Sequence, residues 1–196
     1  MHYLTVSFSH KNSDITAREK LAFTETSKEE ALATLTCEDT KISEAIIVST
    51  CNRVEILAST NDTAKASTEI FEMLSRHSGL SIEELEGRAD VFENEGAVHH
   101  LFAVTSSLDS VVIGETQIAG QIKDAFKFAY DRGHCSQKLS RVMHYAFKCA
   151  ADVRNQTEIA KKPISVASVA VDKAKKLFGK LDGEIAVVIG TGEMGE

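Results

Sequence analysis

The first 93 residues alternate between short β-type runs and segments whose apolar positions have helical spacing. Strand patterns occur at 3–9, 45–49 and 54–58, with a weaker one at 90–93. The helical signals between them are a short helix capped by Asp14 or Thr16, a helix from Ser27 to about Cys37 opened by a capping box with Glu30, and a helix from Ala64 to His77 closed by Gly79. This order, β-α-β-β-α-β, predicts an α+β fold built on a ferredoxin-like unit.

The chain after residue 96 is predicted to be mostly helical. Apolar residues recur every three or four positions at 97–105, 117–132, 137–156 and 164–178. Lys162-Pro163 predicts a break, because the residue before proline disfavours the α region. The apolar run 184–189 is typical of a buried strand. We therefore expect the ferredoxin-like unit to be followed by a helical subdomain, and then by the first helix and strand of a truncated Rossmann domain, with domains at 1–156 and 157–196.

A glycine motif follows the last predicted strand. Gly190-Thr191-Gly192-Glu193-Met194-Gly195 has the GxGxxG spacing. After a strand, the first glycine permits a tight turn, the second lets backbone amides approach a pyrophosphate, and the third allows close helix–strand packing. We expect this motif to bind a nucleotide cofactor in the intact protein, and the chain to be a fragment that stops where the nucleotide-binding domain begins. The alternative is a glycine-rich loop after an unrelated strand.

Composition is that of a globular protein, with 43% hydrophobic and 26% charged residues among 196. No apolar run approaches the roughly 20 residues of a membrane span, and no signal peptide is evident. The four cysteines have no CxxC spacing, which argues against a metal site and a disulfide framework and favours the cytoplasm. We expect Cys37, Cys135 and Cys149 to be small hydrophobic filler.

The formal net charge of −7 gives no general electrostatic attraction to nucleic acid. Contact with RNA would need a local basic patch. The predicted helix 137–156 offers one in Lys138, Arg141, Lys148 and Arg154, although the same residues also suit an ordinary solvated face.

A reactive thiol is predicted at the tip of the central hairpin. The turn Thr50-Cys51-Asn52-Arg53 separates two β-type runs. Residues two apart in an extended segment face the same side, so Arg53 is placed to favour the thiolate of Cys51 or to bind a substrate carboxylate with its bidentate fork. Spacing alone equally allows a buried cysteine and a surface arginine.

A second polar cluster lies between residues 97 and 121. His99 and His100 are adjacent, and neighbours on a helix point about 100° apart, so we expect at most one of them to face any given pocket. Gln117 and Gln121 are one helical turn apart and share a face. Glu115 sits near the N-terminus of that helix, where the helix dipole favours a carboxylate, or it simply caps the helix.

Several separated motifs together resemble the glutamyl-tRNA reductase family over essentially the whole chain. They are Ser49-Thr50-Cys51-Asn52-Arg53-x-Glu55, His100-Leu101-Phe102, Leu108-Asp109-Ser110, Gly114-Glu115-x-Gln117-Ile118-x-Gly120-Gln121 and Gly190-x-Gly192-x-Met194-Gly195. Two positions depart from the pattern: Thr116 stands where proline is common, and Val54 where a small polar residue is common.

The resemblance implies an NADPH-dependent oxidoreductase that makes glutamate-1-semialdehyde, the first step of five-carbon tetrapyrrole (porphyrin and heme) biosynthesis. Cys51 would attack glutamyl-tRNA(Glu) and form a thioester, and His100 would manage protons or position the substrate. The glutamate pocket would be lined by Thr50, Cys51, Asn52, Arg53, Ser110, Glu115, Thr116, Gln117 and Gln121. Arg53 would hold the side-chain carboxylate and Glu115 the ammonium group.

By the same resemblance, Gly190 to Gly195 would bind NADPH, and a C-terminal domain would make the intact protein a cytoplasmic homodimer that does not enter the membrane. Glutamate-1-semialdehyde aminomutase would be a further partner. The fragment itself is expected to form the thioester or hydrolyse the ester. Two other readings stay open: a thiol acyltransferase or hydrolase without a redox role, and a non-catalytic RNA-binding module.

Overall fold

A computed structural model of the chain describes residues 1–115, 117–159, 166–183, 185 and 187. Its strands are β1 (His2–Ser9), β2 (Ile42–Ser49), β3 (Arg53–Thr60) and β4 (Asp90–Glu93). Its helices are α1 (Ile15–Leu21), α2 (Glu25–Leu35), α3 (Thr63–Ser78), α4 (Ile82–Glu86), α5 (Glu95–Thr105), α6 (Gln117–Asp131), α7 (Gln137–Gln156) and α8 (Val166–Phe178). The mixed order of helices and strands confirms the predicted α+β class.

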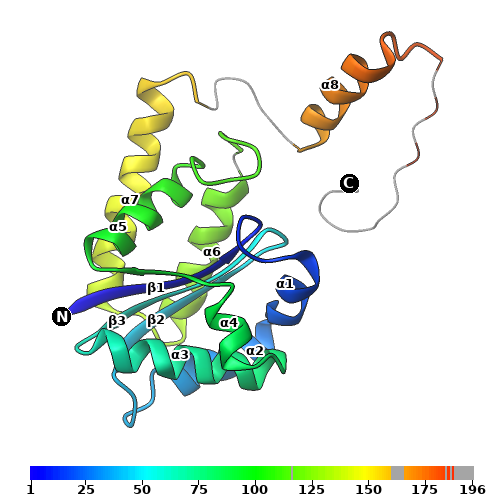
Figure 1. Cartoon of the computed structure of the whole chain (residues 1–196). Coiled ribbons are helices and arrows are strands. Elements are labelled where there is room, and N and C mark those ends of the chain that lie inside the picture. Colours follow the sequence, from blue (N-terminus) through cyan, green and yellow to red (C-terminus); the bar gives the residue numbers. More distant parts are fainter. Residues whose placement is uncertain (116, 160–165, 184, 186, 188–196) are drawn as a thin grey trace.

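The strands form one antiparallel sheet with the order β2-β3-β1-β4. Figure 1 shows α2, α3 and α4 on one face of this sheet and α5, α6 and α7 on the other. The predicted helical subdomain therefore packs directly on the sheet. Because both faces are covered, the central strand β3 is buried at all of its 8 positions, charged residues included. The short strand β4 forms one edge.

The two faces of the sheet differ in polarity. On β1, Leu4, Val6 and Phe8 are fully buried and point toward the first group of helices. The alternate residue Ser7 pairs in register with Glu55 of β3, and both point toward α5–α7. Polar side chains inside the protein thus gather on the face that α5 covers.

The sequence predicted the end of α3 correctly and the start of α2 wrongly. Gly79 closes α3 with φ 73°, as expected for a left-handed cap. The capping box of α2, however, begins at Thr24, whose side chain accepts from the backbone N–H of Ser27, so the prediction that Ser27 caps the helix is wrong. Thr24 takes the cap because its backbone is extended, while Ser27 already lies in the first helical turn.

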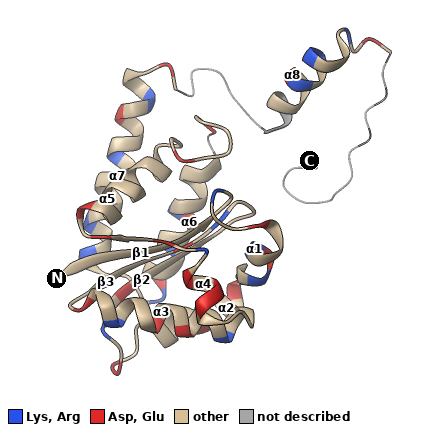
Figure 2. Ribbon diagram, in the orientation of Figure 1, with Lys and Arg blue, Asp and Glu red and all other residues tan. Residues whose placement is uncertain are grey.

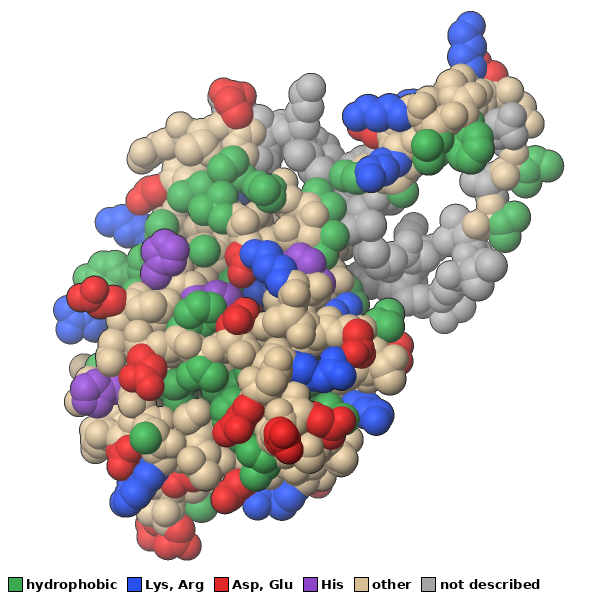
Figure 3. All heavy atoms as spheres, viewed as in Figure 1, with side chains coloured by type: hydrophobic (Ala, Val, Ile, Leu, Met, Phe, Trp, Pro, Cys, Tyr) green, Lys and Arg blue, Asp and Glu red, His purple; other side chains and the backbone are tan. Residues whose placement is uncertain are grey.

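The C-terminal part of the described chain contains α8. The described part of this helix is Val166–Phe178, and the first two residues of the predicted helix 164–178 lie outside the described residues. Leu177 and Phe178 at its end are exposed, and Figure 3 shows hydrophobic side chains on the surface of the helix. The predicted break at Lys162-Pro163 lies outside the described residues. So do the predicted strand 184–189, apart from residues 185 and 187, and the glycine motif.

Candidate active site

The turn that carries Cys51 is held by its own residues. The backbone N–H of Thr50 donates to the carbonyl of Arg53 at 2.9 Å, and Thr50 Oγ1 accepts from the N–H groups of Asn52 and Arg53, each at 3.2 Å. Cys51 at the tip is exposed, whereas the Arg53 side chain is only 2% exposed. The alternative of a buried cysteine and a surface arginine is therefore wrong.

The loop after β1 and the helix α1 hold the turn from the other side. The N–H of His10 in the loop donates to the carbonyl of Asn52 at 3.1 Å, and Arg18 Nε of α1 donates to the carbonyl of Cys51 at 3.4 Å. These two bonds anchor the turn and fix the position of the thiol.

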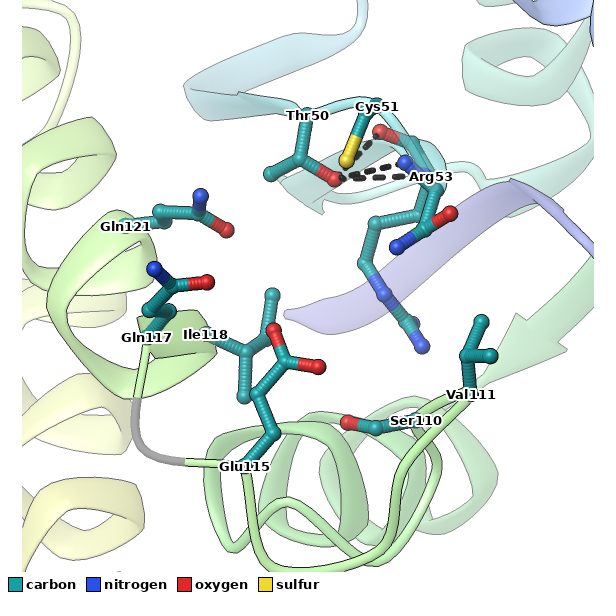
Figure 4. Close-up of a pocket in the computed structure, with 10 residues that line it drawn as sticks. Thr50, Cys51, Arg53, Ser110, Val111, Glu115, Gln117, Ile118 and Gln121 are labelled. Carbon is teal, nitrogen blue, oxygen red and sulfur yellow. Dashed lines mark hydrogen bonds between the residues drawn. The ribbon is translucent and has the colours of Figure 1, made fainter. Parts of the chain in front are cut away.

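A pocket opens beside the thiol (Figure 4). It is lined by Thr50, Cys51, Asn52, Arg53, Ser110, Val111, Glu115, Gln117, Ile118 and Gln121. All of the residues that the sequence assigned to the glutamate site lie here, except Thr116, which is outside the described residues. Sequence reasoning missed Val111 and Ile118, although Ile118 lies on the helix face of Gln121, three residues away.

The pocket is narrow as it stands. Its free volume is about 30 Å³, two to three times the minimum of about 10–15 Å³ that a cavity needs to hold one water molecule. Ser110 Oγ is buried at the wall and has no hydrogen-bond partner among the described residues. A buried hydroxyl without a partner is costly unless a ligand or water meets it. The Ser110 hydroxyl can therefore form a hydrogen bond with a ligand that enters the pocket.

Arg53 is a buried cation in the wall of this pocket. Its Nη1 donates to Glu55 Oε1 at 2.5 Å, and its Nη2 donates to the backbone carbonyl of Asp109. These two bonds use two of the five N–H groups of a guanidinium. Among the described residues, no partner is seen for the remaining N–H groups.

Glu55 anchors this arginine and two further groups. Its Oε1 accepts from Arg53, from Ser7 Oγ at 3.0 Å and from His100 Nε2 at 2.9 Å. Burial alone would raise the pKa of Glu55. The hydrogen bond and charge of His100, with Arg53 and Ser7, outweigh that effect and leave its pKa below the ordinary range. Glu55 is therefore an ionised acceptor inside the protein.

His100 lies on the other side of Arg53, away from the thiol pocket. It lines a hollow of about 520 Å³ together with Lys11, Phe92, Glu95, Gly96, His99, Ala103, Leu108 and Asp109. Figure 3 shows histidine, basic and acidic side chains close together near the middle of the view. The His100 ring stacks on Phe92 with centroids 4.3 Å apart, and its Nδ1 is 3.8 Å from Asp109 Oδ2.

The expectation that at most one of the two adjacent histidines faces a given pocket is wrong. His99 and His100 both line the hollow, because it runs along α5 from Glu95 to Ala103 and meets neighbouring positions of the helix. Only His100, however, has a bond to Glu55 among the described residues.

Sequence reasoning quoted Glu55 and Asp109 within the motifs but gave them no role, and it missed Ser7, Lys11 and Phe92. A signal for Glu55 was present, since it lies two residues after Arg53 on the same strand face.

Lys11 pairs with Asp109 in the hollow. Burial tends to raise the pKa of Asp109, but Lys11 and Arg53 outweigh it and lower that pKa.

The other three cysteines differ in burial. Cys135 is buried, which raises the pKa of its thiol to about 11 and fits a filler role. Cys149 is half-buried, so it fills the core only in part. Cys37 is exposed, so its prediction as filler is wrong; it follows the C-cap residue Thr36 of α2, at a position the core does not reach. Among the described residues, no group of three His, Cys, Asp or Glu side chains is placed to hold a metal ion.

The predicted cofactor residues Gly190, Thr191, Gly192, Glu193, Met194 and Gly195 lie outside the described residues. Within the part of the chain that the structure describes, no helix is both long enough and apolar enough to cross a bilayer.

Comparisons with known proteins agree with the motifs. A family model described as the N-terminal domain of glutamyl-tRNAGlu reductase matches residues 6–157. Relatives named glutamyl-tRNA reductase include those of Sulfurimonas denitrificans, 57% identical over 196 residues, and Wolinella succinogenes, 58% identical over 196 residues. Each match covers 100% of this chain and 45% of the relative, so the chain spans about half the length of these proteins.

A solved structure is also similar. The glutamyl-tRNA reductase from Methanopyrus kandleri matches with a TM-score of 0.68 and 29% sequence identity, over 98% of this chain and 44% of that chain. The family model, the relatives and this structure agree, and the chain therefore belongs to the glutamyl-tRNA reductase family.

Proposed function

We propose that the protein containing this chain reduces the glutamyl group of glutamyl-tRNA(Glu) to glutamate-1-semialdehyde, the first step of tetrapyrrole biosynthesis. The chain supplies the thiol step of that reaction. The observation that carries the proposal is an exposed cysteine at the mouth of a pocket whose wall holds a buried arginine. The family of the chain gives the substrate class.

The Cys51 sulfur attacks the ester carbonyl of glutamyl-tRNA. A bond forms between sulfur and the carbonyl carbon, and the bond from that carbon to the ribose oxygen breaks, so the tRNA leaves with its hydroxyl group restored. The glutamyl thioester stays on Cys51. Gly190 to Gly195 would hold NADPH, which would supply a hydride to the thioester carbon; the carbon–sulfur bond would break, releasing the aldehyde and returning the Cys51 thiol. Without that hydride the chain is limited to thioester formation and slow hydrolysis of the ester.

The pocket holds the glutamyl group through charge and hydrogen bonds. The guanidinium of Arg53 suits the side-chain carboxylate, because it matches a carboxylate in shape and charge. Glu115 also lines the pocket (Figure 4), and we assign it to the ammonium group. The Ser110 hydroxyl, which has no partner among the described residues, supplies a further hydrogen bond.

Contact with the tRNA body is proposed along α7. Figure 2 shows basic residues at intervals on this helix. Arg141 and Lys148 are exposed and lie seven residues apart, so they share one face. Lys138 Nζ donates to Ser43 Oγ and is thus engaged elsewhere, whereas Arg154 is exposed at the C-terminal end of the helix.

We also propose the finer fold description: a ferredoxin-like unit and helical layer at 1–156, then a linker and the start of a Rossmann domain at 157–196. The strand order β2-β3-β1-β4, with helices between β1 and β2 and between β3 and β4, supports the first part. The relatives are about twice as long as this chain, which leaves room for a cofactor domain and a dimerisation domain. Association with an aminomutase stays a prediction.

The test is acylation of the chain by glutamyl-tRNA. Incubation followed by peptide mass spectrometry should show one glutamyl group on Cys51, and the Cys51→Ser variant should show none. Cys37→Ser is the matched control, because Cys37 is also exposed but is not among the residues that line the pocket. An adduct that survives in Cys51→Ser would defeat the proposal. NADPH consumption by the full-length protein, dependent on Cys51, would separate a reductase from a simple thiol hydrolase.

A further inference from the structure

Arg53 needs a fixed partner to keep its place in the pocket wall. A buried guanidinium without a counter-charge is strongly unfavourable. Glu55 supplies that charge from the same strand and the same face, with Nη1 and Oε1 2.5 Å apart and both side chains less than a tenth exposed. The direction of the Arg53 side chain is therefore set by where the Glu55 carboxylate is held.

The Glu55 carboxylate is held by donors from three elements. Ser7 comes from β1, Arg53 from β3 and His100 from α5, and all three meet the single atom Oε1. An ionised carboxylate only accepts hydrogen bonds, so His100 meets it with an N–H at Nε2. Stacking on Phe92 fixes the plane of the ring that carries this N–H.

His100 does not reach the thiol pocket itself. It is not among the residues that line the pocket, and its second nitrogen faces Asp109 and the hollow on the far side. Arg53 lies between the two spaces, because it lines the pocket and donates to the Asp109 carbonyl in the hollow's wall. The effect of His100 on the substrate must therefore pass through Glu55 and Arg53.

We infer that Glu55 and His100 are positioning residues: the Nε2–H of His100 fixes the Glu55 carboxylate, and Glu55 aims the Arg53 guanidinium at the glutamyl group. His100 then needs only a hydrogen-bond donor at one place and no ability to exchange a proton. The inference rests on the proposed function, since it assigns roles within the same site.

The experiment replaces His100 by two amide side chains of different length. In His100→Gln the amide nitrogen can occupy the place of Nε2, whereas in His100→Asn it stands near Nδ1 and falls short of Glu55. The rate of Cys51 acylation by glutamyl-tRNA should stay within about threefold of the parent in His100→Gln and fall at least about tenfold in His100→Asn, as expected for the loss of one hydrogen bond to a charged group. His99→Gln is the control on the same helix.

The pH dependence separates positioning from proton transfer. The acylation profile of His100→Gln from about pH 5 to about 8 should match that of the parent. If His100 transfers a proton, His100→Gln should instead lose about 100-fold or more together with a limb of the profile. That result, or equal losses in the glutamine and asparagine variants, would overturn the inference.

A second measurement does not depend on the reaction. In spectra of the chain with ¹⁵N-labelled histidine, the Nε2–H of His100 should be protected from exchange, and Glu55→Gln should shift its signal while the His99 signals stay in place. Unmoved His100 signals would reject the positioning role even if Cys51 is acylated. Absence of acylation in the parent, with the His100 signals responding to Glu55→Gln, would reject the proposed function and leave the hydrogen bond standing.

Discussion

Removal of the Glu44 carboxylate should loosen the second helical layer from the sheet. Glu44 of β2 is 3% exposed and accepts from Ser136 Oγ at 2.6 Å. It also accepts from the backbone N–H groups of Ser136, Lys138 and Leu139 at 3.0, 3.1 and 2.8 Å. Ser136 makes no side-chain cap for α7, so a residue 92 positions away performs that role.

The magnitude follows from the groups left without a partner. Glu44→Ala removes the acceptor of three backbone N–H groups at the start of α7, and each costs about 1 to 1.5 kcal/mol when water reaches it only in part. The free energy of unfolding should fall by about 3–5 kcal/mol, which lowers the melting temperature by roughly 10 °C for a chain of this size. Glu44→Gln keeps one acceptor oxygen and should lose about half as much.

Urea unfolding followed by circular dichroism at several pH values tests this. Burial alone would raise the pKa of Glu44, but the hydrogen bonds from Ser136, Leu139 and Lys138 outweigh it and lower that pKa. The folded-state pKa therefore lies below the unfolded value of about 4.3. The carboxylate stabilises the fold fully above that value, and this stabilisation is lost as the pH falls through the folded-state pKa. The gap between the parent and Glu44→Gln should therefore be full at neutral pH and shrink in acid.

Glu72→Ala is the matched control, because Glu72 is exposed on α3. It should change the free energy of unfolding by no more than about 0.5 kcal/mol. The capping argument would be refuted if Glu44→Ala unfolded at the same urea concentration as Glu72→Ala. It would also be refuted if the difference in unfolding free energy between the parent and Glu44→Gln stayed constant in acid.

Three further predictions can be tested. Ser110→Ala should leave stability unchanged but raise the KM for glutamyl-tRNA about tenfold in steady-state kinetics of the full-length protein, because it removes a hydrogen bond made only to the ligand. Replacing Arg141 and Lys148 together by glutamine should reduce the salt dependence of tRNA binding, seen by fluorescence anisotropy, by a slope of about 1–2. Gly79→Ala should cost about 1 kcal/mol in urea unfolding, because its φ is 73° while no neighbouring atom obstructs the new methyl group.

The sequence predicted features whose cause is local. The hairpin around Cys51 follows from β-branched runs on both sides of a turn, and Gly79 follows from the backbone conformation that ends α3. The prediction that Ser27 caps α2 was wrong because Ser27 with Glu30 has the spacing of a capping box, and so does Thr24 with Ser27. The backbone of the preceding loop decides between them, and that loop is placed by packing.

The sequence patterns did not predict features that depend on the second covered face of the sheet. Arg53 and Glu55 look like surface residues on a half-buried strand until α5 covers them. The same holds for Glu44, whose partners lie more than 90 residues away along the chain. The polar residues of β3 gave no local sign that they would be covered, although the continuous apolar run at 45–48 is typical of a strand buried on both faces.

The buried polar face itself argues for function over stability. A buried ion pair such as Arg53 with Glu55 is seldom worth more to a fold than well-packed apolar side chains of the same volume. The opposite face of the same strands shows that apolar packing is available here, with Leu4, Val6 and Phe8 fully buried. The buried charges lie on one face of the sheet only, beside an exposed thiol. We therefore infer that they are retained for the pocket and not for stability.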